Sequence, residues 1–452
     1  MGSFRVQIAS TYRLQLSKQF TFDDAAACAG YLASLGVTRV YCSPILQATH
    51  GSSHGYDVVD PTRVNDDLGG EVAFRRLITA LNEHGLQLVV DIVPIARRVV
   101  EVGHQLPERP LIMVHDYQLY LVPKMVRREL PGAIITHFVH IPWPTPQYWK
   151  VLPRHMRDAI LEGLLGCDIV GFQSSLDVRN FLMTCDENAG LAVDDKERAV
   201  LIDGRVVYAR HYPISIEVAA TTRLAFSHSV LVEERKLREW RPEHLIVRID
   251  RTDPSKNIVR GFLAYEKLLD HHPELKGHVQ FWAFLQPSRQ DVAVYRDYLR
   301  LIRSTAHRIN RRYGGGGWSP IRLDFGESVR KAMAALRNFD VLLVNPVYDG
   351  LNLVSKEGAL VNRNNGVIVL SENAGAYEEL HPHVLSVNPF DIEATADAIY
   401  RGLVMGAEEK RRRNEGARDV VRTNDISRWI SRQVQDIRDL VGTPGMRARM
   451  SS

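Results

Sequence analysis

The sequence predicts an α/β fold in which mainly parallel sheets are covered by helices. Short apolar runs rich in Val, Ile and Leu alternate with amphipathic helical patterns along almost the whole chain, which is typical of this fold class. The chain has 452 residues, of which 45% are hydrophobic and 24% are charged. It is therefore long enough for about two to three domains with buried cores.

The first 94 residues are expected to form a strand-helix-strand unit followed by a loop, a second helix and a third strand. Gly36 and Gly85 mark the ends of the two helices, because glycine readily adopts the left-handed conformation that closes a helix. The expected strands are 6–16, 37–45 and 86–93, and the expected helices are 23–35 and 71–84.

The alternation continues over residues 95–230, which are assigned to the remainder of a first α/β domain. Strands are expected at 111–114, 134–140 and 169–172, helices at 117–129 and 176–185, and a hairpin within 194–204. A second domain is assigned to 231–425, with strands at 245–249, 279–285, 321–325, 341–344, 367–370 and 384–387 and helices at 231–240, 258–270, 291–312 and 329–337. Residues 426–452 form a terminal segment that begins with an amphipathic helix over 426–441.

Composition excludes several classes of protein. Lys and Arg exceed Asp and Glu by only 4, so the sequence does not indicate a nucleic-acid partner. The longest uncharged stretch, 131–149, holds four prolines and two histidines, which a membrane-spanning helix would not tolerate, and the N-terminus has no signal-peptide pattern. Four scattered cysteines, Cys28, Cys42, Cys167 and Cys185, suggest reduced thiols rather than a disulfide framework or zinc site. We therefore expect a cytoplasmic protein without a bound metal.

Polar residues gather directly after four of the predicted strands, where α/β sheets bind their ligands. These residues are His115 and Asp116, His140, the segment Asp250–Asn257, and the segment Asn345–Leu353. Arg251 and Lys256 could hold a diphosphate or could be solvated surface cations. Asp349 could bind sugar hydroxyls or could cap the next helix. The two histidines and Asp116 could line a polar cleft or could make ordinary core hydrogen bonds.

Seven ordered motifs between residues 111 and 441 resemble the trehalose-6-phosphate synthase family. The motifs are His115–Leu119, His140–Pro144, Gly171–Gln173, Pro213–Glu217, Arg251–Lys256, Pro287–Arg289 and Asp349–Glu357. This family consists of retaining glycosyltransferases with the GT-B fold, a pair of Rossmann-type domains. The resemblance implies transfer of glucose from a nucleotide sugar, most simply UDP-glucose, to glucose 6-phosphate. It implies neither a cofactor nor a covalent enzyme intermediate.

The resemblance also implies roles for individual residues. On the donor side, Arg251 and Lys256 match residues that hold the diphosphate, and Glu357 matches a residue that holds the ribose. The glucose and phosphates are held by residues that match Asp349 and the backbone of Leu351, Asn352, Leu353 and Val354. On the acceptor side they are Asp116, His140 and Arg289, of which Arg289 faces the sugar phosphate. Asp116, His140 and Asp349 are the residues nearest the reacting groups.

Residues 1–94 resemble a different protein family, the maltooligosyl trehalose synthases, which are (β/α)8-barrel members of the α-amylase superfamily. The matching motifs are Thr11–Leu16, Tyr41–Pro44, Ser52–Asp57 and Asp91–Pro94. Tyr56, Asp57 and Asp91 match substrate-site positions, but the nucleophile and the general acid of that family lie on later strands and have no counterpart here. We therefore expect no glycosidase activity.

The junction leaves alternatives open. Members of the resembled family carry, in about their first hundred residues, a Gly-rich loop under the donor phosphates, an acceptor-phosphate arginine and aromatic residues around glucose 6-phosphate. These motifs are not found here, so the first Rossmann-type domain is expected to be incomplete. The N-terminal segment could substitute for the missing part, or the chain could bind donor without catalysing transfer. The segments Arg251–Asn257 and Ser386–Asp391 also resemble related pseudo-glycosyltransferases that use a cyclitol phosphate. Expected partners are a nucleotide sugar, a sugar phosphate and possible further copies of the chain, with no membrane.

Overall fold

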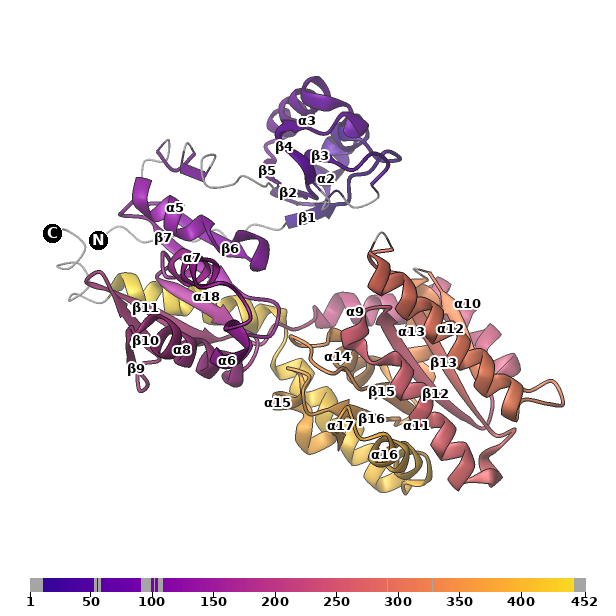
Figure 1. Ribbon diagram of the computed structural model, residues 1–452. Coiled ribbons are helices and arrows are strands. Elements are labelled where there is room, and N and C mark those ends of the chain that lie inside the picture. Colours follow the sequence, from indigo (N-terminus) through magenta and orange to yellow (C-terminus); the bar gives the residue numbers. More distant parts are fainter. Residues whose placement is uncertain are drawn as a thin grey trace. The chain divides into compact units, whose positions relative to one another are not determined.

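The computed structural model describes residues 11–52, 55, 58–90, 99–100, 102–104, 109–290, 292–326 and 328–442 (Figure 1). The chain divides into two compact units, one made of Met1–Pro110 with Val122–Ala133 and the other of Leu111–Leu121 with Ile134–Ser452. The sequence-based boundary at residue 94 stays a prediction, because residues 91–98 lie outside the described ranges.

The first unit contains a small parallel sheet with the strand order β1-β2-β5 and a separate antiparallel pair, β3 and β4. Its elements are β1 (Thr11–Leu14), α1 (Phe22–Ala27), α2 (Ala29–Ser34), β2 (Arg39–Cys42), β3 (Leu46–Ala48), β4 (Val58–Val64), η1 (Asp66–Leu68), α3 (Gly70–Glu83), β5 (Gln87–Val90) and α5 (Val122–Glu129). Phe22, Leu32, Val40 and Leu77 belong to its core. The prediction of one helix over 23–35 is wrong, since the backbone breaks at Cys28 between α1 and α2.

The second unit begins with a six-stranded sheet of order β6-β7-β8-β11-β10-β9. Its elements are β6 (Leu111–His115), η2 (Tyr117–Leu119), β7 (Ile134–Phe138), α6 (Pro146–Trp149), α7 (Arg154–Leu164), β8 (Ile169–Phe172), α8 (Ser175–Ala189), β9 (Ala192–Asp194), β10 (Ala199–Ile202) and β11 (Arg205–His211). Strands β6, β7, β8 and β11 run parallel, and β10 and β9 extend the sheet as antiparallel strands. The prediction of one helix over 117–129 is wrong. The turn η2 ends at Leu119 and α5 starts at Val122, because Pro123 fits a first helical turn but not a helix interior.

The C-terminal domain of this unit is a six-stranded, fully parallel sheet of order β14-β13-β12-β15-β16-β17. Its strands are β12 (His244–Arg251), β13 (Val279–Gln286), β14 (Ile321–Phe325), β15 (Val341–Val344), β16 (Val367–Ser371) and β17 (Leu385–Val387). Two apolar clusters, one with Val247 and Leu342 and the other with Ile246 and Leu343, place a packed layer on each face, as in a doubly wound Rossmann domain.

The helices of the C-terminal domain and its short 3-10 turns complete these layers. They are α9 (Val218–Ala225), α10 (His228–Trp240), η3 (Pro254–Lys256), α11 (Ile258–His271), η4 (Pro273–Leu275), α12 (Ala293–Tyr313), α13 (Val329–Asn338), α14 (Leu353–Val361), α15 (Tyr377–Leu380), η5 (His381–His383), α16 (Ile392–Val404) and α17 (Ala407–Thr423). The strand order reverses between β12 and β15, and ligands bind at the carboxyl ends of strands at such a switch point.

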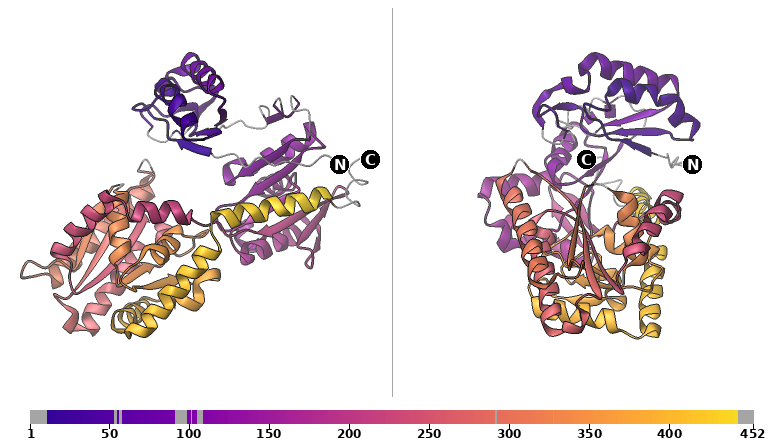
Figure 2. Two further views of the ribbon diagram at one scale, coloured as in Figure 1. Left: turned by 180° about the vertical axis from the view of Figure 1, so that it is seen from behind. Right: turned by 90° about the vertical axis from the view of Figure 1, so that its right-hand side faces the viewer.

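The last helix, α18 (Ile426–Gly442), returns to the sheet that begins the second unit (Figure 2). Its Ile437 and Leu440 pack with Phe138 and Ile169 in one buried cluster. The Tyr212 hydroxyl donates a hydrogen bond to Asp436, and the Trp429 indole N–H donates to the Tyr212 carbonyl at 3.2 Å. The preceding helix, α17, packs instead on α14 of the C-terminal domain.

Two sequence-based expectations concern thiols and membranes. None of the four cysteines, all of them in the described ranges, forms a disulfide, and Cys42, Cys167 and Cys185 are buried. Within the described ranges, no helix combines the length and the apolar character that crossing a membrane requires.

Candidate functional site

The predicted donor residues Lys256 and Asp349 meet at the switch point of the C-terminal sheet. The Lys256 Nζ lies 2.6 Å from Asp349 Oδ2, and the two side chains are only 13% and 16% exposed. The side-chain amide of Asn352 donates a hydrogen bond to the same carboxylate oxygen at 3.0 Å. Lys256 ends η3, which follows β12, whereas Asp349 precedes α14, which follows β15. The fold therefore joins two residues that lie 93 positions apart in the sequence.

The structure shows that Asp349 does not cap the helix that follows it. The residue that caps α14 is Asn352, whose side-chain oxygen accepts a hydrogen bond from the Ser355 amide at 3.2 Å. Asp349 lies outside the helix, so the interpretation of this residue as the helix cap is wrong. Its carboxylate is oriented by a lysine and an amide and can accept hydrogen bonds from a polar ligand.

Arg251 has a more open environment than Lys256. Its side chain is 56% exposed, and its guanidinium lies 3.0 Å from the buried carboxylate of Asp253. Strand β12 extends to Arg251 rather than ending at residue 249, because its pairing with β13 continues to Gln286. Arg251 thus projects from the carboxyl end of a central strand, where it is anchored at one side and accessible to an anion.

A buried arginine that the sequence analysis did not select fixes this end of the sheet. The side chain of Arg248 is fully buried, with its Nε 2.8 Å from Asp250 and its Nη1 donating to Asn345 at 2.6 Å. It also donates to the backbone carbonyl of Lys256. Burial raises the pKa of Asp250, and the adjacent Arg248 opposes that rise. Charged residues at 248, 250 and 251, directly after the apolar run 245–247 of the same strand, were the signal that could have identified this network.

The loop that carries Asp349 depends on two glycines. A Cβ atom at Gly350 would clash with the carbonyl oxygen of His140, and one at Gly375 would clash with the carbonyl oxygen of Gly350. The Gly375 amide donates to the Asp349 carbonyl at 3.1 Å. These close approaches place the donor-side loop directly against the strand end that carries His140.

The first turn of α14 contains the remaining predicted donor residues. Leu351 is buried, Leu353 is 38% exposed and Val354 is partly buried. Asn352 has a positive φ of 78°, which turns the chain into the helix. A helix N-terminus presents backbone N–H groups without intrahelical partners, so this turn can receive phosphate oxygens.

Two consecutive charged residues of α14 differ in whether their buried side chains have polar partners. Lys356 is fully buried, and its Nζ lies 2.5 Å from Glu379 and donates to the Ile214 carbonyl at 3.0 Å. Glu357 is largely buried and has no polar partner among the described residues. Burial raises the pKa of Glu357 to about 7. Lys356 is therefore a structural residue, whereas Glu357 is a carboxylate that a ligand hydroxyl would stabilise.

The predicted acceptor residues Asp116 and His140 lie together with His115 at the ends of β6 and β7. The Nδ1 atom of His115 is 3.1 Å from the Nε2 atom of His140, and burial lowers the pKa of each imidazole to about 4. Both rings are therefore neutral near pH 7, and one donates to the other. The Asp116 carboxylate accepts a hydrogen bond from the Tyr117 amide at 2.9 Å. This group provides a neutral imidazole pair beside a carboxylate.

Arg289 follows β13 and lies on the C-terminal side of the site. Its guanidinium donates to the Tyr295 hydroxyl at 3.0 Å. The preceding residue, Ser288, donates its amide to the Thr252 hydroxyl at 3.2 Å, which ties this loop to the segment after β12. Tyr295, Tyr117 and Asp253 raise the pKa of the Arg289 guanidinium against the opposing effect of burial.

Left-handed backbone conformations are concentrated at this site. Seven described non-glycine residues have a positive φ, and four of them are Asp116 (70°), Asn257 (61°), Arg289 (46°) and Asn352 (78°). Such conformations are costly for residues with a Cβ atom and cluster at ligand sites.

Three residues that the α-amylase resemblance singled out, Tyr56, Asp57 and Asp91, lie outside the described residues. Within the described ranges, no group of three or more His, Cys, Asp or Glu side chains has the arrangement of a metal site.

Comparisons with known proteins match most of the chain to one protein family. Residues 96–439 match the model of glycosyltransferase family 20. A bifunctional trehalose-6-phosphate synthase/phosphatase from Thermoproteus tenax is 36% identical over 322 residues, which cover 71% of this chain and 44% of that protein. The chain thus spans less than half the length of this relative.

Solved structures agree with the sequence matches. A UDP-forming α,α-trehalose-phosphate synthase from Burkholderia xenovorans, in complex with glucose-6-phosphate, is 31% identical with a TM-score of 0.69 over 76% of each chain. A trehalose-6-phosphate protein from E. coli, bound with UDP-2-fluoro glucose, is 30% identical with a TM-score of 0.70 over 80% of this chain and 78% of that one. Residues 29–105 match the model of the α-amylase catalytic domain. Both resemblances drawn from the sequence, and the GT-B-like fold, are confirmed.

Proposed function

This chain is a member of glycosyltransferase family 20, and we propose that it transfers glucose from UDP-glucose to glucose 6-phosphate, which yields trehalose 6-phosphate and UDP. The observation that carries the proposal is the joining of Lys256 and Asp349 at the switch point of the C-terminal sheet, 2.6 Å apart. Family membership supports the reaction type, and this geometry supports the presence of a formed donor site.

On the donor side, the diphosphate is expected to lie among Arg251, Lys256 and the first turn of α14. The half-exposed guanidinium of Arg251 and the helix N–H groups stabilise the negative charge that develops on the leaving diphosphate. Glu357 accepts hydrogen bonds from the ribose hydroxyls, since it is a largely buried carboxylate without a polar partner among the described residues. Asp349 receives hydroxyl groups of the transferred glucose.

On the acceptor side, Asp116 and His140 are expected to orient the sugar hydroxyl that attacks, and Arg289 to bind the sugar phosphate. The His115–His140 hydrogen bond fixes the imidazole of His140 in one orientation. The close contact between Gly350 and the His140 carbonyl keeps the two halves of the site adjacent. Positioning of this kind replaces the activation of an enzyme nucleophile.

We propose that the reaction needs no metal ion, because fixed cations already face the leaving group. Addition of EDTA to the purified protein is expected to leave turnover unchanged. A loss of turnover that Mg²⁺ restores would refute this part of the proposal.

The experiment that tests the proposed function measures UDP release from UDP-glucose with and without glucose 6-phosphate. Release that depends on glucose 6-phosphate is expected, together with trehalose 6-phosphate as the product. Absence of turnover across a panel of nucleotide sugars and sugar phosphates would refute the proposal. A cyclitol phosphate belongs in the panel, because related enzymes use such acceptors.

A second candidate is a protein that binds the donor without transferring glucose. The observation that favours it is the α-amylase match over residues 29–105, which precedes the family 20 match over 96–439 and overlaps only its first residues. This candidate predicts UDP binding by calorimetry with no binding of glucose 6-phosphate in the same cell. Binding of both compounds would exclude it.

A further inference from the structure

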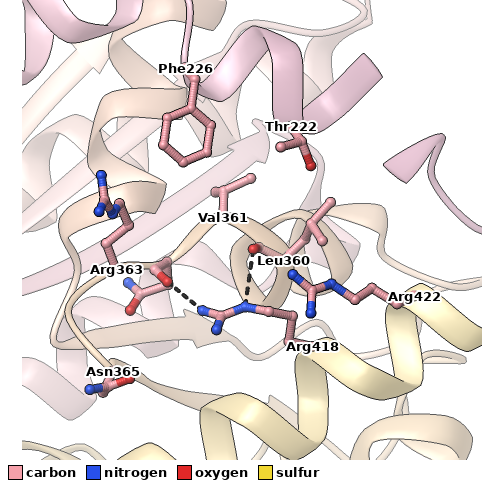
Figure 3. Close-up of a pocket in the computed structure, with 9 residues that line it drawn as sticks. Thr222, Phe226, Leu360, Val361, Arg363, Asn365, Arg418 and Arg422 are labelled. Atoms are coloured by element: carbon pink, nitrogen blue, oxygen red, sulfur yellow. Dashed lines mark hydrogen bonds between the residues drawn. The ribbon is translucent and has the colours of Figure 1, made fainter. Parts of the chain in front are cut away.

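The C-terminal domain contains a pocket outside the donor and acceptor groups. It has a volume of about 330 Å³ and lies where α9, the end of α14 and α17 come together (Figure 3). Three arginines, Arg363, Arg418 and Arg422, contribute to its lining with Asn362, Asn365 and Phe226, and none of the described residues that line it is acidic. This composition indicates a site for an anion.

The positive charge in the pocket is poorly compensated. Arg363 forms no ion pair with any described residue. The Nη1 atom of Arg422 lies 3.9 Å from Oδ1 of Asp419, and both side chains are more than half exposed. Arg418 donates to the Leu360 carbonyl at 3.3 Å, the Asn362 carbonyl at 2.6 Å and the Asn414 side chain at 2.6 Å, all of them neutral acceptors. Burial chiefly, and then the neighbouring Arg422, lower the pKa of Arg418, whereas Glu415 and Asp419 oppose this shift.

The geometry suits a small ligand. Figure 3 shows Arg418 and Arg422 next to each other on α17, whereas Arg363, from the segment after α14, extends toward Phe226, with its Cζ atom 5.5 Å from the centre of that ring. The Nε and Nη2 atoms of Arg418 are occupied by the bonds to neutral acceptors, and its Nη1 makes no hydrogen bond to a described residue. Guanidinium groups bind phosphate and carboxylate oxygens in pairs, and an exposed ring such as Phe226 can contact an apolar part of the ligand.

The pocket is separate from the proposed donor site. It lies at the last residues of α14, whereas Asn352 and Leu353 stand at the first turn of this nine-residue helix. At a rise of about 1.5 Å per residue, the two ends are about 14 Å apart. A diphosphate at Arg251 and Lys256 therefore does not occupy this pocket.

We propose that this pocket is a second anion site, which binds a small multivalent oxyanion through Arg363, Arg418 and Arg422. A phosphorylated metabolite and a polycarboxylate both present this chemistry. The proposal is independent of the transferase activity, since none of these arginines belongs to the donor or acceptor groups.

The test is calorimetric titration of the full-length chain with inorganic pyrophosphate, in the presence of saturating UDP to fill the donor site. We expect about one bound pyrophosphate per chain, weakened at least about tenfold in Arg363→Gln and in Arg422→Gln. Arg412→Gln is the matched control, because Arg412 lies exposed on the same helix and does not line the pocket. Melting curves of the variants verify folding. Arg418 is not altered, since its bonds hold the end of α14.

A second experiment, which does not depend on UDP binding, uses the Arg251→Ala variant. If this variant still binds pyrophosphate, and the double variant Arg251→Ala with Arg363→Gln binds it more weakly, the proposal is supported even if the transferase proposal fails. Citrate replaces pyrophosphate in a parallel titration: tighter binding of pyrophosphate assigns a phosphate ligand, and tighter binding of citrate assigns a carboxylate ligand. The proposal is overturned if neither anion binds, or if both pocket variants bind as well as Arg412→Gln.

Discussion

The ionisation of Glu357 offers a quantitative test of the donor site. Burial raises the pKa of this carboxyl from its ordinary 4.5 to about 7. The difference of about 2.5, at about 1.36 kcal/mol per pH unit, corresponds to about 3 kcal/mol by which the folded protein disfavours the ionised form. The sign follows from proton binding: between pH 4.5 and 7 the folded chain holds more protons than the unfolded chain, so stability falls as pH rises through this window.

The variant Glu357→Gln removes this penalty. We expect it to unfold at the same denaturant concentration as the unaltered protein near pH 4, and to be more stable by up to about 3 kcal/mol above pH 7. Chemical denaturation at a series of pH values measures the difference. An equal stability of the two proteins above pH 7 would contradict the burial argument.

The same group makes donor binding depend on pH. Ribose hydroxyls donate to the ionised carboxylate, so UDP-glucose affinity is expected to fall by up to about tenfold per pH unit below pH 7. UDP-glucose suits this titration because it lacks the terminal phosphate ionisation near pH 6. His115 and His140, with pKa values lowered to about 4, do not titrate in this range. Calorimetry at pH 5.5–8 would refute the reasoning if the unaltered protein and Glu357→Gln gave the same pH profile.

Other predictions concern the phosphates and the contact between the two sides of the site. Arg251→Ala is expected to weaken UDP binding about tenfold, and Lys256→Ala to weaken it more, because Lys256 is the more buried cation; calorimetry that ranks them in the opposite order would count against the assignment. Gly350→Ala is expected to abolish turnover, since its new methyl group would meet the His140 carbonyl. Gly406→Ala, which has open space, is the control, and equal turnover of both glycine variants would exclude the close contact.

Local patterns predicted the secondary structure where a single signal dominated. The strands at 169–172 and 341–344 coincide with β8 and β15, because continuous apolar runs bounded by polar residues leave little choice. The helix breaks at Cys28 and before Pro123 were missed. In both places an amphipathic pattern continues across the break, so periodicity alone does not reveal it.

The site shows a different limit of sequence reasoning. Residue types alone left Asp349 as either a ligand group or a helix cap, and the motifs of the family were needed to select it. Contacts such as Lys256 with Asp349, or Lys356 with Glu379, join separate elements and leave no trace in local spacing. The bond from Arg248 to Asn345 could not be predicted from local spacing, because Asn345 follows β15, which pairs with β12 only in the folded sheet.

The left-handed residues of the site have a consequence for attempts to make this protein more heat-resistant. Asp116, at φ 70° and ψ 167°, occupies a region that is nearly reserved for glycine and costs on the order of 1 to 3 kcal/mol. A library screened for thermal survival alone would therefore favour Asp116→Gly, which relaxes the backbone and deletes the carboxylate. Asn352→Gly would be favoured for a similar reason, with loss of the amide that holds Asp349. Screens of this chain for thermal stability should thus measure ligand binding at every round, because the substitutions that relax the backbone fall on residues that are proposed to hold the ligands.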